Sequence, residues 1–321
     1  MSGPNELEST ESDRNELDRN ELDRNELDRI LLSFSTLPST RTQPLSALRS
    51  GIDKFARAFP IDPEVTLTQA TLAGRPVEWL VARSDGPVML YLHGGGYVIG
   101  SPRSHRHLSA RLAQCMLGRV ATLDYRLAPE APWPAAVDDA VAAYRALLET
   151  YPSQRIVIAG DSAGGGLAFI SLIRALKQGL PMPACLVAFS PWVNQQSDGA
   201  SFDDPGVNDP LISRQDADFF ADHYAPAKLR RHPEVSPLFA DLAGLPPCLI
   251  QAGEREVFIA DIRKFADALH NAGVPVCCEV WPTMFHVWHL YWPMLARARA
   301  AIDDVARFVQ SNVSNTKHDN K

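Results

Sequence analysis

One stretch constrains the fold of this chain more than any other. Residues 155–166 read Arg-Ile-Val-Ile-Ala-Gly-Asp-Ser-Ala-Gly-Gly-Gly, a short apolar run that ends at Ser162 and is followed directly by a helix-length apolar pattern. Gly160 and Gly164 lie two positions from the serine on either side, where a Cβ would collide with the neighbouring strand or helix. The stretch predicts a sharp strand-to-helix turn with Ser162 at its apex. A glycine-rich turn with an ordinary serine is the alternative, and the context decides between them.

The rest of the chain alternates short apolar runs with helix-length patterns. Besides the run that ends at Ser162, strands are expected at 66–72, 77–82, 88–92, 119–125, 185–190, 249–252 and 276–281. Helices are expected at 46–59, 108–116, 134–151, 167–176, 259–271 and 296–309. This alternation indicates an α/β sandwich with a mainly parallel sheet, which binds ligands at the carboxyl ends of its strands.

The N-terminal residues contain a repeat that does not fit the alternation of strands and helices. The pentapeptide Asn-Glu-Leu-Asp-Arg occurs at 15–19, 20–24 and 25–29. On a helix, a five-residue period turns each leucine by about 140° from the one before, so the leucines cannot share a face. We expect residues 1–29 to have no core to join and to be disordered. A coiled coil is excluded because the spacing is neither three nor four.

The remaining segments are expected to divide the chain by function. Residues 30–62 carry two short apolar patterns and are expected to form N-terminal cap helices. The catalytic α/β domain is expected at 63–312, and a stretch rich in Asp and Pro within it is expected to form a cap insertion at about 194–225. Residues 313–321 are expected to be a disordered tail.

Charge and cysteine usage exclude several classes of partner. The net charge of −7 offers no basic surface for nucleic acid or an anionic membrane. No apolar run reaches membrane-spanning length and the N-terminus is acidic, so a cytoplasmic location is expected. Five cysteines lack paired metal-ligand spacing and are expected to be buried thiols in a reducing compartment, with Cys277 and Cys278 pointing to opposite faces of a strand.

A nucleophilic serine needs a base within hydrogen-bond reach and a third group that orients the base. In hydrolases with a serine on such a turn, the acid and then the histidine follow it along the chain. His286 directly follows the last expected strand and is the candidate base. His289 could compete but is expected at the start of the next helix. A metal site on these two histidines would need a third ligand that the sequence does not offer, so no metal is expected.

The loop after residues 249–252 supplies the candidate acids. Glu256 precedes Val257 and Phe258, an apolar pair that could anchor the loop and turn the carboxylate inward. Asp261 is expected in the first turn of a helix, where the helix dipole stabilises it, and it remains the alternative. Glu254 is expected to be solvated.

Backbone donors for an oxyanion are expected at two places. Three glycines follow His93 at the end of an apolar strand, and they let backbone N–H groups approach a ligand closely. Ala163 lies beside the serine at a helix start. Gly94, Gly95 and Ala163 are therefore the candidate donors.

Together, these motifs resemble those of the hormone-sensitive-lipase-like branch of the α/β-hydrolases, the bacterial esterases called family IV. The resemblance covers about residues 45–310, and it is carried by His93–Tyr97, Asp124–Glu130, Gly160–Gly165, Gly253–Val257 and Phe285–Trp288. It implies an α/β-hydrolase fold with a mainly parallel eight-stranded sheet, flanking helices and a helical cap. The stretch Asp124–Glu130 looks structural in this branch, where it fixes the loop under the oxyanion hole.

The same resemblance implies roles for the candidate residues. Ser162 is the nucleophile, His286 the general base and Glu256 the acid, without a metal or an organic cofactor. Most members carry Asp where Glu256 stands, and this departure keeps Asp261 open as the acid. Substrate choice would lie with the cap, and the candidate pocket walls, each equally compatible with ordinary packing, are Tyr97, Phe202, Phe219, Met284 and Trp288.

The expected function is hydrolysis of short- to medium-chain carboxylic esters or of lactones through an acyl-enzyme. Amide hydrolysis on the same residues is an alternative. A third alternative is a non-catalytic binding protein on the same fold, which the plant gibberellin receptor is by resemblance. That receptor type lacks the catalytic histidine, whereas His286 is present here. In this family the last strand often pairs across a two-fold axis, so a homodimer through residues 276–281 is expected.

Overall fold

The apolar runs of the sequence form one eight-stranded sheet in the order β1-β2-β4-β3-β5-β6-β7-β8. A computed structural model describes residues 24–36 and 39–313. Strand β2 runs antiparallel to β1 and β4, and the other neighbours are parallel, which confirms the mainly parallel sheet. The strands are β1 Thr66–Leu72, β2 Arg75–Val81, β3 Val88–Leu92, β4 Arg119–Leu123, β5 Ile156–Asp161, β6 Cys185–Phe189, β7 Cys248–Gly253 and β8 Val276–Trp281.

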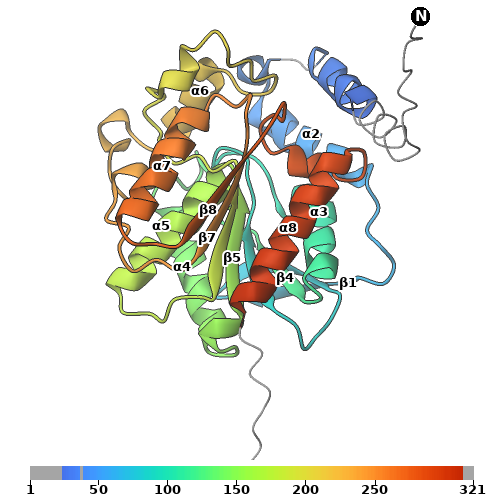
Figure 1. The fold of residues 1–321 in the computed structure, drawn as a ribbon, viewed down its shortest axis with the longest axis vertical. Coiled ribbons are helices and arrows are strands. Elements are labelled where there is room, and N and C mark those ends of the chain that lie inside the picture. The colour runs from blue at the N-terminus through green and yellow to red at the C-terminus, as the bar shows by residue number, and fades with distance from the viewer. Residues whose placement is uncertain (1–23, 37–38, 314–321) are drawn as a thin grey trace, which may run out of the picture.

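Helices cover both faces of the sheet (Figure 1). One apolar cluster joins α4, α5 and α7 to one face, and a second joins α3 and α8 to the other. Central strands β3, β5, β6 and β7 are buried along their whole length, which is why they read as continuous apolar runs. The helices are α2 Leu45–Arg57, α3 Pro102–Cys115, α4 Ala135–Leu148, α5 Ala163–Lys177, α6 Arg214–Tyr224, α7 Ile259–Asn271 and α8 Ala296–Asn312.

The segment between β6 and β7 lies beyond the carboxyl ends of the strands and contains α6. Within it, we call residues 194–225 the insertion. Helix α6 has no counterpart among the expected helices. It begins at a capping box, in which the Ser213 side chain accepts from the Asp216 N–H and the Asp216 side chain accepts from the Ser213 N–H. An aspartate of this Asp-rich stretch therefore helps to start the helix.

A helix over residues 24–34 corrects the expectation for the end of the repeat. Leu27, Ile30 and Phe34 are buried against Met284, Phe285, Trp288 and α8. The prediction that the repeat has no core to join is wrong for its last copy, residues 25–29. Leu27 belongs to an apolar face of this helix because Ile30 and Phe34, which lie beyond the repeat, follow it at helical spacing. Residues 1–23 and 314–321, expected to be disordered, lie outside the described residues.

The five cysteines are free thiols. Cys185 and Cys248 are buried as expected, whereas Cys115 and Cys278 are half-buried and Cys277 is exposed. The prediction of five buried thiols is therefore wrong for these three. Cys277 and Cys278 alternate in exposure along β8, at the edge of the sheet, where one face of the strand meets solvent. Within residues 24–36 and 39–313, no helix is both long enough and apolar enough to cross a membrane.

Candidate active site

Ser162 occupies the predicted turn between β5 and α5. Its backbone has φ 51° and ψ −120°, a conformation that residues other than glycine seldom adopt. A Cβ on Gly164 would lie 1.9 Å from the Leu92 carbonyl oxygen, and one on Gly160 would lie 2.4 Å from the Gly164 carbonyl oxygen. The two glycines are therefore required by sterics, and the predicted strand-to-helix turn is confirmed.

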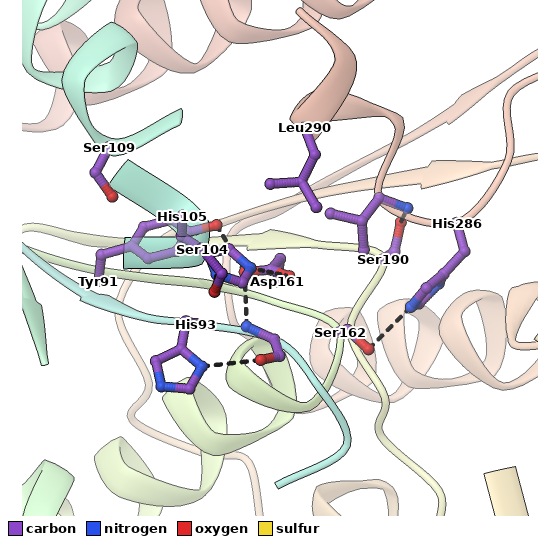
Figure 2. Close-up of polar contacts among 12 residues, drawn as sticks. Tyr91, His93, Ser104, His105, Ser109, Asp161, Ser162, Ser190, His286 and Leu290 are labelled. Carbon is purple, nitrogen blue, oxygen red and sulfur yellow. Dashed lines mark hydrogen bonds and ion pairs between the residues drawn. The ribbon is translucent and has the colours of Figure 1, made fainter. Parts of the chain in front are cut away.

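Three side chains from the ends of three strands meet at this turn. His286, five residues beyond β8, places Nε2 2.9 Å from Ser162 Oγ. The other ring nitrogen, Nδ1, lies 3.1 Å from Oε2 of Glu256, which follows β7. Figure 2 shows the His286 ring directed at Ser162. The structure thus joins Ser162, His286 and Glu256 in one hydrogen-bonded chain.

Ser190 joins the loop of Glu256 to the loop of His286, and no sequence pattern indicated it. Its hydroxyl donates to Glu256 Oε1 at 2.6 Å and accepts from the Val287 N–H at 3.0 Å. The Gly253 N–H donates to the same carboxylate oxygen. Ser190 follows β6 and no motif surrounds it, so only the meeting of three strand ends reveals its position.

The surroundings of His286 favour its charged form. Burial of the ring disfavours the imidazolium, but the hydrogen bond to Glu256 and the charges of Glu256, Asp209 and Asp161 outweigh burial, and the pKa of His286 is raised above its ordinary 6.5. Asp209 belongs to the insertion and was not a candidate in the sequence. The site therefore stabilises a positive charge on the His286 ring.

The alternatives to Glu256 and His286 lie elsewhere. Asp261, in the first turn of α7, accepts from Asn194 Nδ2 at 3.2 Å, and burial raises its pKa. His289 Nε2 lies 3.0 Å from Gln251 Oε1, and burial lowers the pKa of His289 to about 3. The described part of the chain contains no cluster of three or more His, Cys, Asp or Glu side chains arranged to hold a metal ion.

The glycine loop, residues 93–97, rests on a buried acid. Asp161 accepts from the Gly94 N–H at 2.9 Å and from the Tyr91 hydroxyl at 2.8 Å, and His105 Nε2 lies 3.3 Å from its second oxygen. Figure 2 shows the Tyr91 and His105 side chains beside Asp161. The Gly94 N–H, expected to bind an oxyanion, is thus engaged by Asp161. This detail depends on a side-chain orientation that no sequence pattern shows.

The next two glycines approach other groups closely. Gly95 and Gly96 have φ values of 116° and 62°. A Cβ on Gly95 would lie 2.3 Å from the Ile99 carbonyl oxygen, and one on Gly96 would lie 2.4 Å from the Phe220 ring. Ala163 is the first residue of α5, where a backbone N–H has no partner within the helix.

The stretch Asp124–Glu130 supports the glycine loop, as the resemblance implied. The Tyr125 ring stacks on His93 with centroids 4.3 Å apart, and its hydroxyl donates to the His93 carbonyl at 2.6 Å. From α2, Arg49 donates to the carbonyls of Val98 and Ala128 and pairs with Glu130. Arg49 therefore joins helix α2 to Val98, which directly follows the glycine loop, and to the stretch that supports the loop.

The five aromatic and Met candidates for pocket walls separate into two groups. Tyr97 is buried and stacks on Tyr224 at 3.7 Å, while Met284 and Trp288 are buried against the helix over residues 24–34. These three lie in packed clusters. Phe202 and Phe219 are half-buried in the insertion.

One aromatic neighbour of the base was missed. Phe258 packs edge-to-face on His286 with centroids 5.3 Å apart, and Phe202 packs edge-to-face on Phe258 at 5.8 Å. The acid loop, residues 254–258, therefore provides both a carboxylate and an apolar wall beside the imidazole.

Known proteins share this architecture. A family model described as the α/β-hydrolase fold matches residues 89–290. An acetyl-hydrolase of Streptomyces hygroscopicus is 43% identical over 279 residues, covering 85% of this chain and 92% of its own. An esterase of Acinetobacter venetianus is 32% identical and covers 85% and 91%.

A solved structure described as an esterase from the bacterial hormone-sensitive lipase family superposes with a TM-score of 0.86 at 38% identity, covering 90% of this chain and 98% of that one. The chain therefore belongs to the α/β-hydrolase family, in its branch of bacterial hormone-sensitive-lipase-like esterases.

Proposed function

We propose that this protein is a serine carboxylic-ester hydrolase with Ser162, His286 and Glu256 as its catalytic triad. The observation that carries the proposal is the chain of contacts from Ser162 Oγ to His286 Nε2 at 2.9 Å and from His286 Nδ1 to Glu256 at 3.1 Å. A serine hydroxyl becomes nucleophilic when a base accepts its proton and an acid fixes the tautomer of that base. The relatives named acetyl-hydrolase and esterase support this reaction class.

In the first half-reaction, Ser162 Oγ attacks the ester carbonyl carbon while His286 Nε2 takes the hydroxyl proton. Glu256 holds the resulting imidazolium, which then gives the proton to the leaving alcohol as the C–O bond breaks. In the second half, water loses a proton to His286 and attacks the acyl-enzyme. Collapse of that intermediate releases the carboxylic acid and returns the proton to Ser162.

We assign the oxyanion donors to the N–H groups of Gly95, Gly96 and Ala163. Gly94 is left out because its N–H is donated to Asp161. The Gly95 carbonyl accepts from the N–H groups of Val98 and Ile99 at 3.0 and 2.9 Å, which holds the loop before substrate arrives. Preorganised donors stabilise the transition state without rearrangement during the reaction.

The substrates we propose are esters with short to medium acyl chains, with lactones as the cyclic variant of the same bond. The acetyl-hydrolase relative supports a small acyl group. On the insertion side, Phe202 and Phe258 present an apolar surface next to His286, which suits an aliphatic acyl or alkyl group.

The test combines covalent labelling with substitution of the serine. A fluorophosphonate is expected to add one phosphonyl group to the wild-type protein at Ser162, located by peptide mass spectrometry. Ser162→Ala is expected to abolish labelling and to lower kcat on p-nitrophenyl acetate by about 10³-fold or more. Ser171→Ala is the matched control, because Ser171 is a buried serine on α5 whose hydroxyl donates to the Leu167 carbonyl. Near-wild-type turnover by Ser162→Ala would reject the proposal.

A further inference from the structure

Asp209 joins the insertion to the acid loop. Its Oδ1 accepts from the N–H groups of Leu211 and Ile212 at 2.9 and 3.1 Å, which orients the carboxylate. Its Oδ2 accepts from the Val257 N–H at 3.2 Å. One carboxylate therefore bridges two segments far apart in the sequence, and the residue it reaches is the neighbour of Glu256.

Further hydrogen bonds join the insertion to the acid loop at the residues on either side of Glu256. Arg255 Nε donates to the Asn208 carbonyl at 3.1 Å. The Ser201 hydroxyl donates to the Val257 carbonyl and accepts from the Ala260 N–H. The N–H and the carbonyl of Val257 are thus both bonded to the insertion. The position of the insertion therefore affects where the neighbouring Glu256 lies.

The charge of Asp209 also acts on the catalytic pair. Two ionisable groups face it, His286 from the loop after β8 and Glu256 from the acid loop. Burial is the largest effect and raises the pKa of Asp209 to about 6; the positive charge of His286 opposes this rise, and the negative charge of Glu256 adds to it. In return, the negative charge of Asp209 raises the pKa of His286.

We propose that Asp209 is a positioning residue that couples the seating of the insertion over the substrate to the alignment and charge of the Glu256–His286 pair. Its carboxylate fixes the acid loop through Val257 and faces the imidazolium from the side of the insertion. When the insertion moves away, the acid loop loses these hydrogen bonds and His286 loses a negative neighbour. This inference rests on the proposed serine-esterase function.

The pH profile separates this role from a merely structural one. In Asp209→Asn, the amide oxygen still accepts from Leu211 and Ile212, but the negative charge is absent and the NH₂ group faces the Val257 N–H, so that hydrogen bond is lost as well. Because that charge favours protonated His286, its loss lowers the pKa of His286, and the acidic limb of kcat/KM is expected to move to lower pH by about half a unit or more. At pH 8, kcat/KM is expected to fall about tenfold, because the imidazolium of the transition state loses stabilisation.

Asp204→Asn is the matched control. Asp204 lies in the same loop and accepts from the Gly206 N–H at 2.8 Å, but it is exposed, and within the described residues its carboxylate makes no hydrogen bond or ion pair to the acid loop. This variant is expected to keep the wild-type limb and kcat/KM. Asp209→Glu keeps the negative charge, and it is expected to keep the wild-type acidic limb even where its longer side chain lowers kcat/KM. It also supplies the test if Asp209→Asn does not fold.

The outcomes are distinguishable from those that test the esterase mechanism. An Asp209→Asn protein with the wild-type limb and kcat/KM, whatever its Tm, would overturn the coupling role while Ser162→Ala still lacked activity. Asp209→Glu supplies a second way to overturn the coupling role. If it moves the acidic limb of kcat/KM to lower pH by as much as Asp209→Asn is expected to, the charge at this position is not what sets the limb. Wild-type turnover by Ser162→Ala would instead reject the mechanism itself.

Discussion

The carboxylate of Glu256 uses its two oxygens differently. One contacts His286, and the other accepts from Ser190 and the Gly253 N–H. Because both oxygens act as acceptors, an amide at this position would present its NH₂ group to a donor on one side or the other. The orientation of His286 therefore depends on a full carboxylate.

This arrangement predicts unequal effects for the two candidate acids. Glu256→Gln is expected to lower kcat/KM by roughly 10²-fold or more, because His286 loses the group that fixes its tautomer. Asp261→Asn is expected to leave kcat/KM near the wild-type value, because Asp261 contacts Asn194 and not the base. Steady-state kinetics of both variants with p-nitrophenyl acetate provide the measurement. The reverse ranking would transfer the acid role to Asp261.

The raised pKa of His286 predicts the position of the acidic limb. The base works only when it is neutral, so kcat/KM of the free enzyme falls as the pH drops through the pKa of His286. That limb is expected above pH 6.5, since the partners of His286 raise its pKa above that ordinary value. A pH profile between 5 and 9 measures it, and a wild-type limb below 6.5 would contradict the charge balance around the ring.

The contact of His105 with Asp161 predicts a role beneath the glycine loop. His105→Ala is expected to lower kcat about tenfold while changing KM little. Asp161 loses the contact with His105 that positions it, and Asp161 in turn accepts the hydrogen bond from the Gly94 N–H that holds the glycine loop. His107→Ala, on the same helix, is the control: His107 is also buried but contacts the Leu290 carbonyl. Equal losses of kcat in the two variants would indicate destabilisation alone.

The sequence predicted the site where a local motif marks it, and it failed where remote segments meet. Ser162 and His286 follow strands within recognisable motifs, and the structure joins them. Ser190 and Asp209 lie in segments without a motif, and their roles arise from contacts 66 and 48 residues away along the chain. The engagement of Gly94 by Asp161 likewise depends on packing beneath the loop.

At the scale of elements, strands were easier to predict than helix starts. Strands β1, β3 and β8 have the expected bounds, because apolar residues cover the whole length of each run or alternate along it. Helix α3 begins at Pro102, six residues before the expected 108, where a capping box on Ser101 and Ser104 starts a polar first turn. Polar helix starts carry little apolar periodicity, so pattern reading places them too late.

The helix over residues 24–34 predicts two different truncation phenotypes. Removing residues 1–23 is expected to preserve Tm and ester turnover, because the buried face of that helix stays whole. Removing residues 1–36 is expected to lower Tm by several degrees and to reduce kcat, because each buried Leu, Ile or Phe side chain stabilises by roughly 1.5–3 kcal/mol. Calorimetry and ester hydrolysis measure both effects. An unchanged Tm for the longer deletion would show that the helix contributes no stability.

For the whole molecule, the edge strand β8 predicts self-association. Its outer side has no strand partner within the described residues, and edge strands are usually covered or paired. We expect a homodimer across a two-fold axis at β8, measured by light scattering on a chromatography column. Cys277→Ser serves as the control, because it removes the exposed thiol and so excludes a disulfide-linked dimer. A monomeric mass for both proteins would contradict the expectation.

The bridge made by Asp209 has a consequence for engineering. Exchanging the insertion with that of a relative is a natural route to new substrate range, because Ser162, His286 and Glu256 all lie outside it, each after a strand of the sheet. An insertion taken from a relative that has no carboxylate at position 209 would supply a new binding surface, but the acid loop would lose its hydrogen bond from Val257. Such hybrids would bind new esters and turn them over slowly, and restoring one aspartate would be the first repair to make.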